Sequence, residues 1–219
     1  DCRIVDIDCD LIELPRRLKR VLDRGRVVDA TLITSGGISL QRLRAAGLRA
    51  GYVPNPTDAS MEVDQDFSQD KTWDLIYVSS DKLHSRRWDL IRNIAAVAPD
   101  LKVGMFGSDM QRILGLRYFE LLSTSKAALN WSLRNDIELY SSDRIAQLFG
   151  CGLCVCLPRS SGFQRFLDEK SAIFFASADD LVQRLRAAVR SGEWIEIGRT
   201  GCNAYRALFG AERVAQYVL

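Results

Sequence analysis

Polar and charged side chains follow two apolar runs in the second half of the chain, at the point where each run ends. After the run that ends at Asn130, Ser142, Asp143 and Arg144 stand at the start of a helical pattern. A later run ends in the Ser-Gly turn of residues 160–162. Hydroxyls, a guanidinium and a helix N-terminus at the carboxyl ends of parallel strands are typical of sites for phosphorylated ligands. We therefore expect an anion site here.

A basic loop after the apolar run 73–80 is the second candidate for chemistry. It carries Lys82, Arg86 and Arg87 just where a helical pattern begins. Cations at a helix start oppose the helix dipole, which favours a role in holding a ligand over a solvated basic face. His84 lies in the same loop and is either a phosphate donor or base, or a surface residue without a role, the interpretation we favour.

The cysteines invite a metal or redox interpretation, because Cys151, Cys154 and Cys156 form CxxCxC. They lie in the apolar segment GCGLCVCLP, so alternate side chains should face opposite sides of a buried strand. The sole histidine, His84, is distant in sequence and completes no zinc pattern. We therefore predict buried thiols, no metal site and a reducing compartment.

The elements that must position these residues alternate between strand and helix. Strand patterns cover residues 3–8, 27–34, 48–54, 73–80, 101–108, 126–131, 153–158 and 171–177. Helical patterns cover residues 14–25, 39–47, 85–98, a short stretch from 117, residues 142–150, and the tail from 178. Such alternation predicts an α/β fold, a Rossmann-like parallel sheet with helices on both faces.

The polar, aperiodic segment 55–72 reads as a linker. It divides the chain into a partial α/β unit with linker, residues 1–66, and a second α/β domain, residues 67–219. The first unit shows only about three strands, which leaves a sheet edge open. We expect either a missing N-terminal segment or a partner that covers this edge.

The composition narrows the class of partners. A hydrophobic content of 47% suits a packed core, and no apolar window approaches a membrane span, so we expect a cytoplasmic protein. The net charge of +2 does not point to nucleic acid. The Arg-rich helices at 14–25 and 182–190 are either solvated faces or surfaces that rest on anionic lipid of the inner membrane. Trp131 is either a core residue or a platform for a base or sugar.

Four segments together resemble a known family. They are DLIYVSSDKLHSRRWDLI, RYFELLSTSKAALN, SSDRIAQLFGCG and FQRFLDEKSAIFFASADDLVQRL. Their order and spacing, over roughly residues 27–218, are similar to the nucleotide-sugar-binding half of a GT-B glycosyltransferase. The nearest group is the "glycosyl transferases group 1" family with its spore-maturation CgeB-like proteins.

The resemblance implies a bacterial enzyme of polysaccharide biosynthesis, with a GT-B C-terminal domain preceded by the end of the acceptor-side domain. It would move a sugar, a hexosyl group, from a nucleoside-diphosphate donor such as a UDP-sugar to a glycan, lipid-linked or protein acceptor. The transfer would be retaining, with no metal and no cofactor.

The resemblance also assigns residues. The donor pyrophosphate would lie against Ser79, Ser80, Lys82, Arg86 and Arg87, and the sugar and ribose against Ser142, Asp143, Arg144 and Gln147. Arg86, Arg87 and Gln147 would be catalytic, and further donor contacts are expected from Gly107, Asn130, Ser141, Ser161 and Gly162.

The chain departs from the family pattern at three positions. Gln147 replaces a Glu that accepts hydrogen bonds from both ribose hydroxyls, whereas Gln offers one acceptor and one donor group. Glu138 is out of register with the family's earlier Glu, and Ser79 stands where Gly is common. The alternative is therefore a non-catalytic nucleotide-sugar-binding or partner-binding module. A Rossmann dehydrogenase is disfavoured, because no GxGxxG follows a strand.

Overall fold

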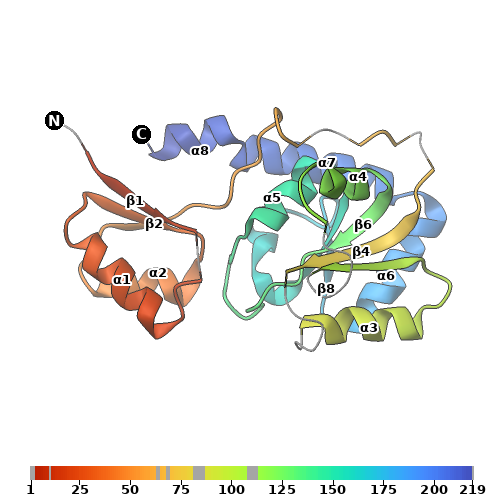
Figure 1. Ribbon diagram of the computed structural model, residues 1–219, viewed down its shortest axis with the longest axis horizontal. Coiled ribbons are helices and arrows are strands. Elements are labelled where there is room, and N and C mark those ends of the chain that lie inside the picture. Colours follow the sequence, from red (N-terminus) through yellow and green to blue (C-terminus); the bar gives the residue numbers. More distant parts are fainter. Residues whose placement is uncertain are drawn as a thin grey trace.

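The computed structural model describes residues 3–9, 11–62, 65–67, 70–80, 87–107 and 113–218. Two parallel sheets lie one after the other along the chain, with helices packed against them. Figure 1 shows the smaller sheet at the N-terminal side and the larger sheet next to it.

The small sheet has three parallel strands in the order β1-β2-β3. Its elements are β1 (Val5–Asp8), α1 (Pro15–Gly25), β2 (Ala30–Ile33), α2 (Gly37–Ala45) and β3 (Ala50–Tyr52). The two helices share a small apolar core with β2, because every third or fourth residue of each helix is apolar. Pro at the first position of α1 suits the helix start, since its missing N–H would have no partner there.

The large sheet has five parallel strands in the order β5-β4-β6-β7-β8. The strands are β4 (Trp73–Ser79), β5 (Val103–Gly107), β6 (Ser125–Leu129), β7 (Cys154–Pro158) and β8 (Ile173–Phe175). The chain adds β5 on one side of β4 and β6 on the other. Ligands bind at the carboxyl ends of strands at such a switch point, here between β4 and β6.

Helices cover both faces of the large sheet (Figure 1). One core includes residues of α3 (Arg87–Val97) and α6 (Ala178–Ser191), and the other includes residues of α4 (Leu116–Ser123) and α5 (Asp143–Gly150). Helix α7 (Trp194–Phe209) contributes to both cores, and α8 (Ala211–Val218) follows it. Two 3-10 turns, Arg159–Ser161 and Phe163–Arg165, come after β7. The predicted α/β class, with parallel strands covered on both faces, is confirmed.

Strand β7 explains the cysteine-rich motif. Cys154 and Cys156 point into one core of the sheet, while Val155 and Leu157 point into the other. Cys151 is buried as well, and none of the three cysteines forms a disulfide with a described residue. The predicted burial of the thiols is confirmed, and so is the alternation of successive strand residues between the two sides of the sheet.

The linker segment contains no helix or strand where the structure describes it, but it packs against the large domain. Asn55, Thr57, Glu62 and Gln65 are all buried. The Thr57 backbone accepts a hydrogen bond from Ala211 N and donates one to Phe209 O, at the junction of α7 and α8. Buried polar groups need such partners, so the described part of the linker is fastened to the large domain at these residues.

Element boundaries differ from the sequence prediction by a few residues. The strand expected over 48–54 is only Ala50–Tyr52, and the helical tail from 178 divides into α6, α7 and α8. Gly192, with φ of 79°, and Gly210 separate these helices. None of the helices in the described ranges is long and apolar enough to cross a membrane.

Candidate functional site

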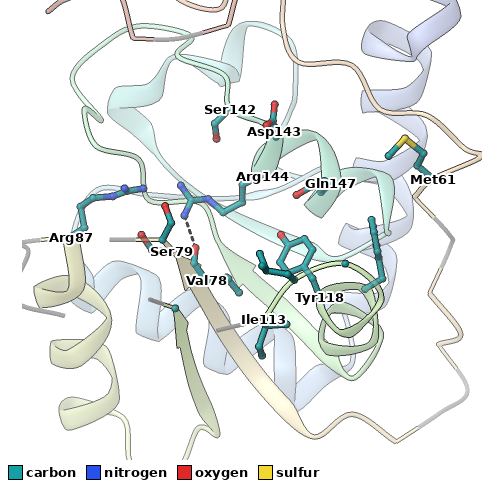
Figure 2. A pocket seen from close by; sticks show the side chains of 15 residues that line it. Met61, Val78, Ser79, Arg87, Ile113, Tyr118, Ser142, Asp143, Arg144 and Gln147 are labelled. Carbon is teal, nitrogen blue, oxygen red and sulfur yellow. Dashed lines mark hydrogen bonds between the residues drawn. The ribbon is translucent and has the colours of Figure 1, made fainter. Parts of the chain in front are cut away.

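A cavity of about 840 Å³ opens at the carboxyl ends of β4 and β5, beside the start of α5 (Figure 2). Its size is in the usual range for small-molecule pockets. One wall is polar and is formed by Ser79, Ser80, Arg87, Ser142, Asp143, Arg144 and Gln147. The other wall is mostly apolar and is formed by Met61, Val78, Gly107, Ile113, Leu114, Gly115, Tyr118 and Phe119.

Arg144 lies at the centre of the polar wall, in the first turn of α5. Its guanidinium donates hydrogen bonds to Val78 O at 2.7 Å, to Asn130 Oδ1 at 3.2 Å and to Trp131 O at 3.2 Å. A guanidinium has five N–H donors, so these bonds leave two for a ligand. The side chain therefore joins β4, β6 and α5 and still faces the cavity.

Arg87, the first residue of α3, approaches the same point. Its Nη2 donates to Trp131 O at 3.3 Å, and Tyr77 Oη donates to that oxygen at 3.1 Å. The guanidiniums of Arg87 and Arg144 thus share one carbonyl acceptor and lie beside Ser79 in Figure 2. Two positive charges converge at the end of β4.

The charge of Arg144 is not balanced by a carboxylate within the described ranges, where it makes no ion pair. Burial lowers the pKa of Arg144, and the nearby charge of Arg87 lowers this pKa further. The side chain sits 5.5 Å over the Tyr77 ring, whose electron-rich face partly offsets the charge. A half-buried, uncompensated cation on a cavity wall favours an anionic ligand.

The start of α5 adds to this preference. Ser142 occupies the N-cap position, but its side chain makes no capping hydrogen bond. Ser142 Oγ is buried and has no hydrogen-bond partner among the described residues. The hydroxyl and the first backbone N–H groups of α5 therefore remain for a ligand, at the positive end of the helix dipole.

Of two further residues that line the cavity, one was predicted from the sequence as a site residue and the other was not. Gln147, one turn after Asp143, was predicted to contact the donor, and it lines the cavity. Tyr118 of α4 also lines it and was not predicted. Burial raises the pKa of Tyr118 to about 12, so its phenol stays protonated and can donate. The apolar residues after β5 carry no motif, so sequence alone offered only their place after a strand.

Gly107 ends β5 where the backbone approaches β4 closely. A Cβ atom there would lie 1.9 Å from Ser79 O and 3.0 Å from the Trp88 ring. The glycine that was predicted to contact the donor is therefore also required for the packing of β5 on β4.

Other predicted donor-binding residues do not line the cavity. Asn130 lies behind Arg144 and accepts from its Nε, and Ser141 Oγ accepts from the backbone N–H of Asn55. Ser161 and Gly162 lie beside the segment of Leu139, whose backbone N–H donates to Ser161 O. Ser161 Oγ is buried without a hydrogen-bond partner among the described residues.

Three positions of the predicted basic loop lie outside the described residues: Lys82, His84 and Arg86. The Trp131 ring does not line the cavity and stacks on Phe175 at 6.2 Å between centroids. Within the described ranges, no group of three or more His, Cys, Asp or Glu side chains could hold a metal ion.

Comparison with solved structures places this arrangement among known folds. HepE of Anabaena, in complex with UDP and glucose, matches with a TM-score of 0.71 and 11% identity, over 99% of this chain and 70% of HepE. Sucrose-phosphate synthase of Thermosynechococcus elongatus matches with a TM-score of 0.66 and 14% identity, over 97% of this chain and 65% of that enzyme. A TarM mutant of S. aureus, in complex with fondaparinux, α-GlcNAc-glycerol and UDP, matches with a TM-score of 0.66 and 10% identity, over 92% of this chain and 45% of TarM.

No curated protein matches the sequence. The chain spans only part of each solved relative, and the TM-scores show a shared fold. The family described as glycosyl transferase-like matches residues 86–219, more than half of the chain. The chain therefore belongs to the glycosyl transferase-like family, and its parallel sheets with helices on both faces are those of GT-B glycosyltransferases.

Proposed function

We propose that this chain binds a nucleoside-diphosphate sugar in the cavity beside α5 and transfers the sugar to an acceptor. The observation that carries the proposal is the pair of guanidiniums, Arg87 and Arg144, which converge on Trp131 O at the cavity wall. Two fixed cations and a helix N-terminus match the charge and size of a diphosphate.

The two walls of the cavity suit the two ends of a nucleotide. The polar wall would take the phosphates, with Ser142 Oγ and the α5 amides as donors. The apolar wall with Tyr118 and Phe119 would take the base, since aromatic side chains stack on base rings. Gln147, one turn further along α5 in the polar wall, would then meet the ribose.

The chemistry follows from where the negative charge develops. As the bond to the sugar breaks, charge builds on the leaving diphosphate, and preorganised cations stabilise that charge more than they stabilise the substrate. We propose that Arg87 and Arg144, with Arg86, the residue before Arg87 in the sequence, supply this stabilisation without a metal or cofactor. In a retaining transfer the diphosphate itself guides the proton of the acceptor hydroxyl.

The solved relatives support the choice of donor and acceptor. Three structures of HepE contain UDP, UDP with glucose, or UDP-glucose, and the TarM structure contains UDP with a glycosylated glycerol. We propose a UDP-hexose donor and a glycan or lipid-linked acceptor for this chain, and we place it with the CgeB-like group on its sequence blocks. The acceptor would enter from the side of residues 1–66, with the donor held by residues 67–219.

A turnover assay tests the proposal. The purified chain is incubated with UDP-glucose, UDP-GlcNAc and GDP-mannose, with EDTA or Mg²⁺, and release of the nucleoside diphosphate is followed. We expect release from one donor that EDTA does not abolish and that rises with a glycan or lipid acceptor. NMR of the product anomer then distinguishes retention from inversion. Release only with Mg²⁺ would contradict the metal-independent mechanism.

A second candidate, a non-catalytic module that binds a nucleotide sugar, is favoured by one observation. Gln147 lines the cavity where we propose that the ribose lies, and it lacks the second acceptor of a carboxylate. Tight nucleotide binding without turnover of any donor would select this candidate.

We also propose that α1 brings a cytoplasmic protein to an anionic membrane. Its exposed Arg16, Lys19 and Arg20 make no ion pair with any described residue, whereas Arg184 and Arg186 of α6 pair with carboxylates. Clustered cations add about 1 kcal/mol each to adsorption on acidic lipid. Sedimentation with vesicles of phosphatidylglycerol should carry the protein down at low salt, and the triple Gln variant of α1 should stay in solution.

A further inference from the structure

Asn55 connects the linker to the start of α5. It is buried, with 6% of its surface exposed, although it lies in a polar loop. Its backbone N–H donates to Ser141 Oγ at 2.9 Å, and its side-chain amide donates to Asp143 Oδ1. Its carbonyl accepts from Tyr205 Oη of α7 at 2.9 Å. One linker residue thus contacts both residues that flank the N-cap of α5.

The backbone around Asn55 is held on both sides. Pro54 precedes it and Pro56 follows it, and a residue before proline is restricted to extended conformations. Val53 N donates to Ile33 O of β2 at 3.0 Å. The backbone that carries the Asn55 side chain therefore has little conformational entropy left to lose when this side chain forms its hydrogen bonds.

The contact with Asp143 has an electrostatic consequence for the cavity. Asp143 precedes Arg144 in the chain and is the nearest carboxylate in sequence to that guanidinium. Successive helical residues point about 100° apart, and the amide of Asn55 holds the carboxylate on the linker side. Arg144 makes no ion pair with any residue that the structure describes, so its charge stays available.

We propose that Asn55 is a positioning residue for the anion site. Its amide keeps Asp143 away from Arg144 and fixes the N-terminus of α5 toward the cavity. Because Asn55 is also tied through Val53 to the small sheet, the position of the N-terminal unit is linked to the geometry of the donor pocket. The identity of the ligand in this inference rests on the proposed function, whereas the role of Asn55 in fixing the start of α5 is independent of that function.

An exchange of donor and acceptor tests this role. Asn55→Asp has almost the same shape, but it removes the N–H donor and sets a second carboxylate against Asp143. The double variant Asn55→Asp with Asp143→Asn restores a hydrogen bond with the net charge of the wild type. Asn203→Asp, on an exposed position of α7, controls for an added negative charge.

Calorimetric binding of UDP and hydrogen exchange of residues 141–150 are measured on all four proteins. We expect Asn55→Asp to weaken UDP binding about tenfold, the loss that corresponds to one hydrogen bond, and to speed exchange at the start of α5. The double variant should recover both properties, and Asn203→Asp should leave both unchanged.

Each other outcome decides the matter. A folded Asn55→Asp protein with wild-type affinity and exchange would overturn the positioning role, and so would a double variant that recovers neither property. If the wild type binds no UDP, GDP, CMP or dTDP, the proposed function fails, and exchange at α5 alone decides whether Asn55 fixes the helix. An affinity that stays low in the double variant while exchange recovers would assign Asp143 a direct ligand contact instead.

Discussion

Nη1 of Arg144 donates a 2.7 Å hydrogen bond to the backbone carbonyl of Val78. Val78 is the second-last residue of β4, and Arg144 stands in the first turn of α5, so this bond fastens the helix to the end of β4. The same guanidinium bonds Asn130 and Trp131 after β6. A single cation therefore spans the switch point of the sheet and remains on the cavity wall.

Replacing Arg144 should separate its charge from its hydrogen-bond geometry. Arg144→Lys keeps the charge and loses the planar fork, while Arg144→Met loses both. Hydrogen bonds to charged groups contribute about 1.5–3 kcal/mol each, so we expect UDP affinity to fall tenfold or more in the Lys variant and further in the Met variant. Calorimetry measures this, with Arg190→Met as the control on an exposed position. Unchanged affinity in a folded Arg144→Met protein would exclude Arg144 from the site.

Gln147→Glu should restore the carboxylate that accepts from both ribose hydroxyls. A second charged acceptor should raise the preference for UDP over 2′-deoxy-UDP by several-fold, since the deoxy ligand lacks one hydroxyl. The ratio of the two dissociation constants is the readout, because it cancels any general effect of the new charge on phosphate binding. A ratio that does not rise would mean that Gln147 does not face the ribose.

Tyr118 should make stability depend on alkaline pH. Burial raises its pKa from 10.0 to about 12 in the folded protein. Below pH 10 the neutral phenol contributes its full stabilisation, and this contribution is lost as the pH rises toward 12, because the unfolded chain releases the proton first. The free energy of unfolding of wild type minus that of Tyr118→Phe should therefore decrease between pH 10 and 12. Tyr217→Phe controls for an exposed phenol, and a difference that is constant with pH would contradict burial of the Tyr118 hydroxyl.

Gly107→Ala should destabilise the fold at the site itself. The new Cβ would lie 1.9 Å from Ser79 O, a backbone atom that can move only if β4 or β5 shifts. We expect a loss of about 3 kcal/mol in denaturant unfolding, the upper end for overpacking. Gly192→Ala meets no atom within 4 Å and carries only the strain of a φ of 79°, so it should cost about 1–2 kcal/mol. Equal losses for the two variants would show that β5 can move aside.

The fold could be predicted from the sequence because the patterns that indicate its strands and helices are local. The apolar run of Cys154–Pro158, bounded by Gly152 and Pro158, predicts a buried strand, and Ser142 with Asp143 predicts a helix start. The length of β3 was not accessible, because pairing with β2 decides where the ladder ends.

The residues of the cavity could be predicted from the sequence only in part. Residues at the end of a strand or the start of the following helix, such as Ser79 and Arg144, could be placed by the rule that parallel strands end at one edge. Asn55 and Tyr118 could not be placed in this way. The role of Asn55 depends on its contact with Asp143, about ninety residues away in the chain, and that of Tyr118 depends on the packing of α4. Such long-range contacts leave no periodicity in the sequence.

The decisive experiment is calorimetric titration of UDP, GDP, CMP and dTDP into the purified chain, in EDTA and again in Mg²⁺. We expect one diphosphate to bind with a dissociation constant of about micromolar order, equally in both buffers, and Arg144→Met to lose this binding. No binding by any of the four nucleotides to the folded chain would contradict the claim that the cavity beside α5 is a nucleotide-sugar site.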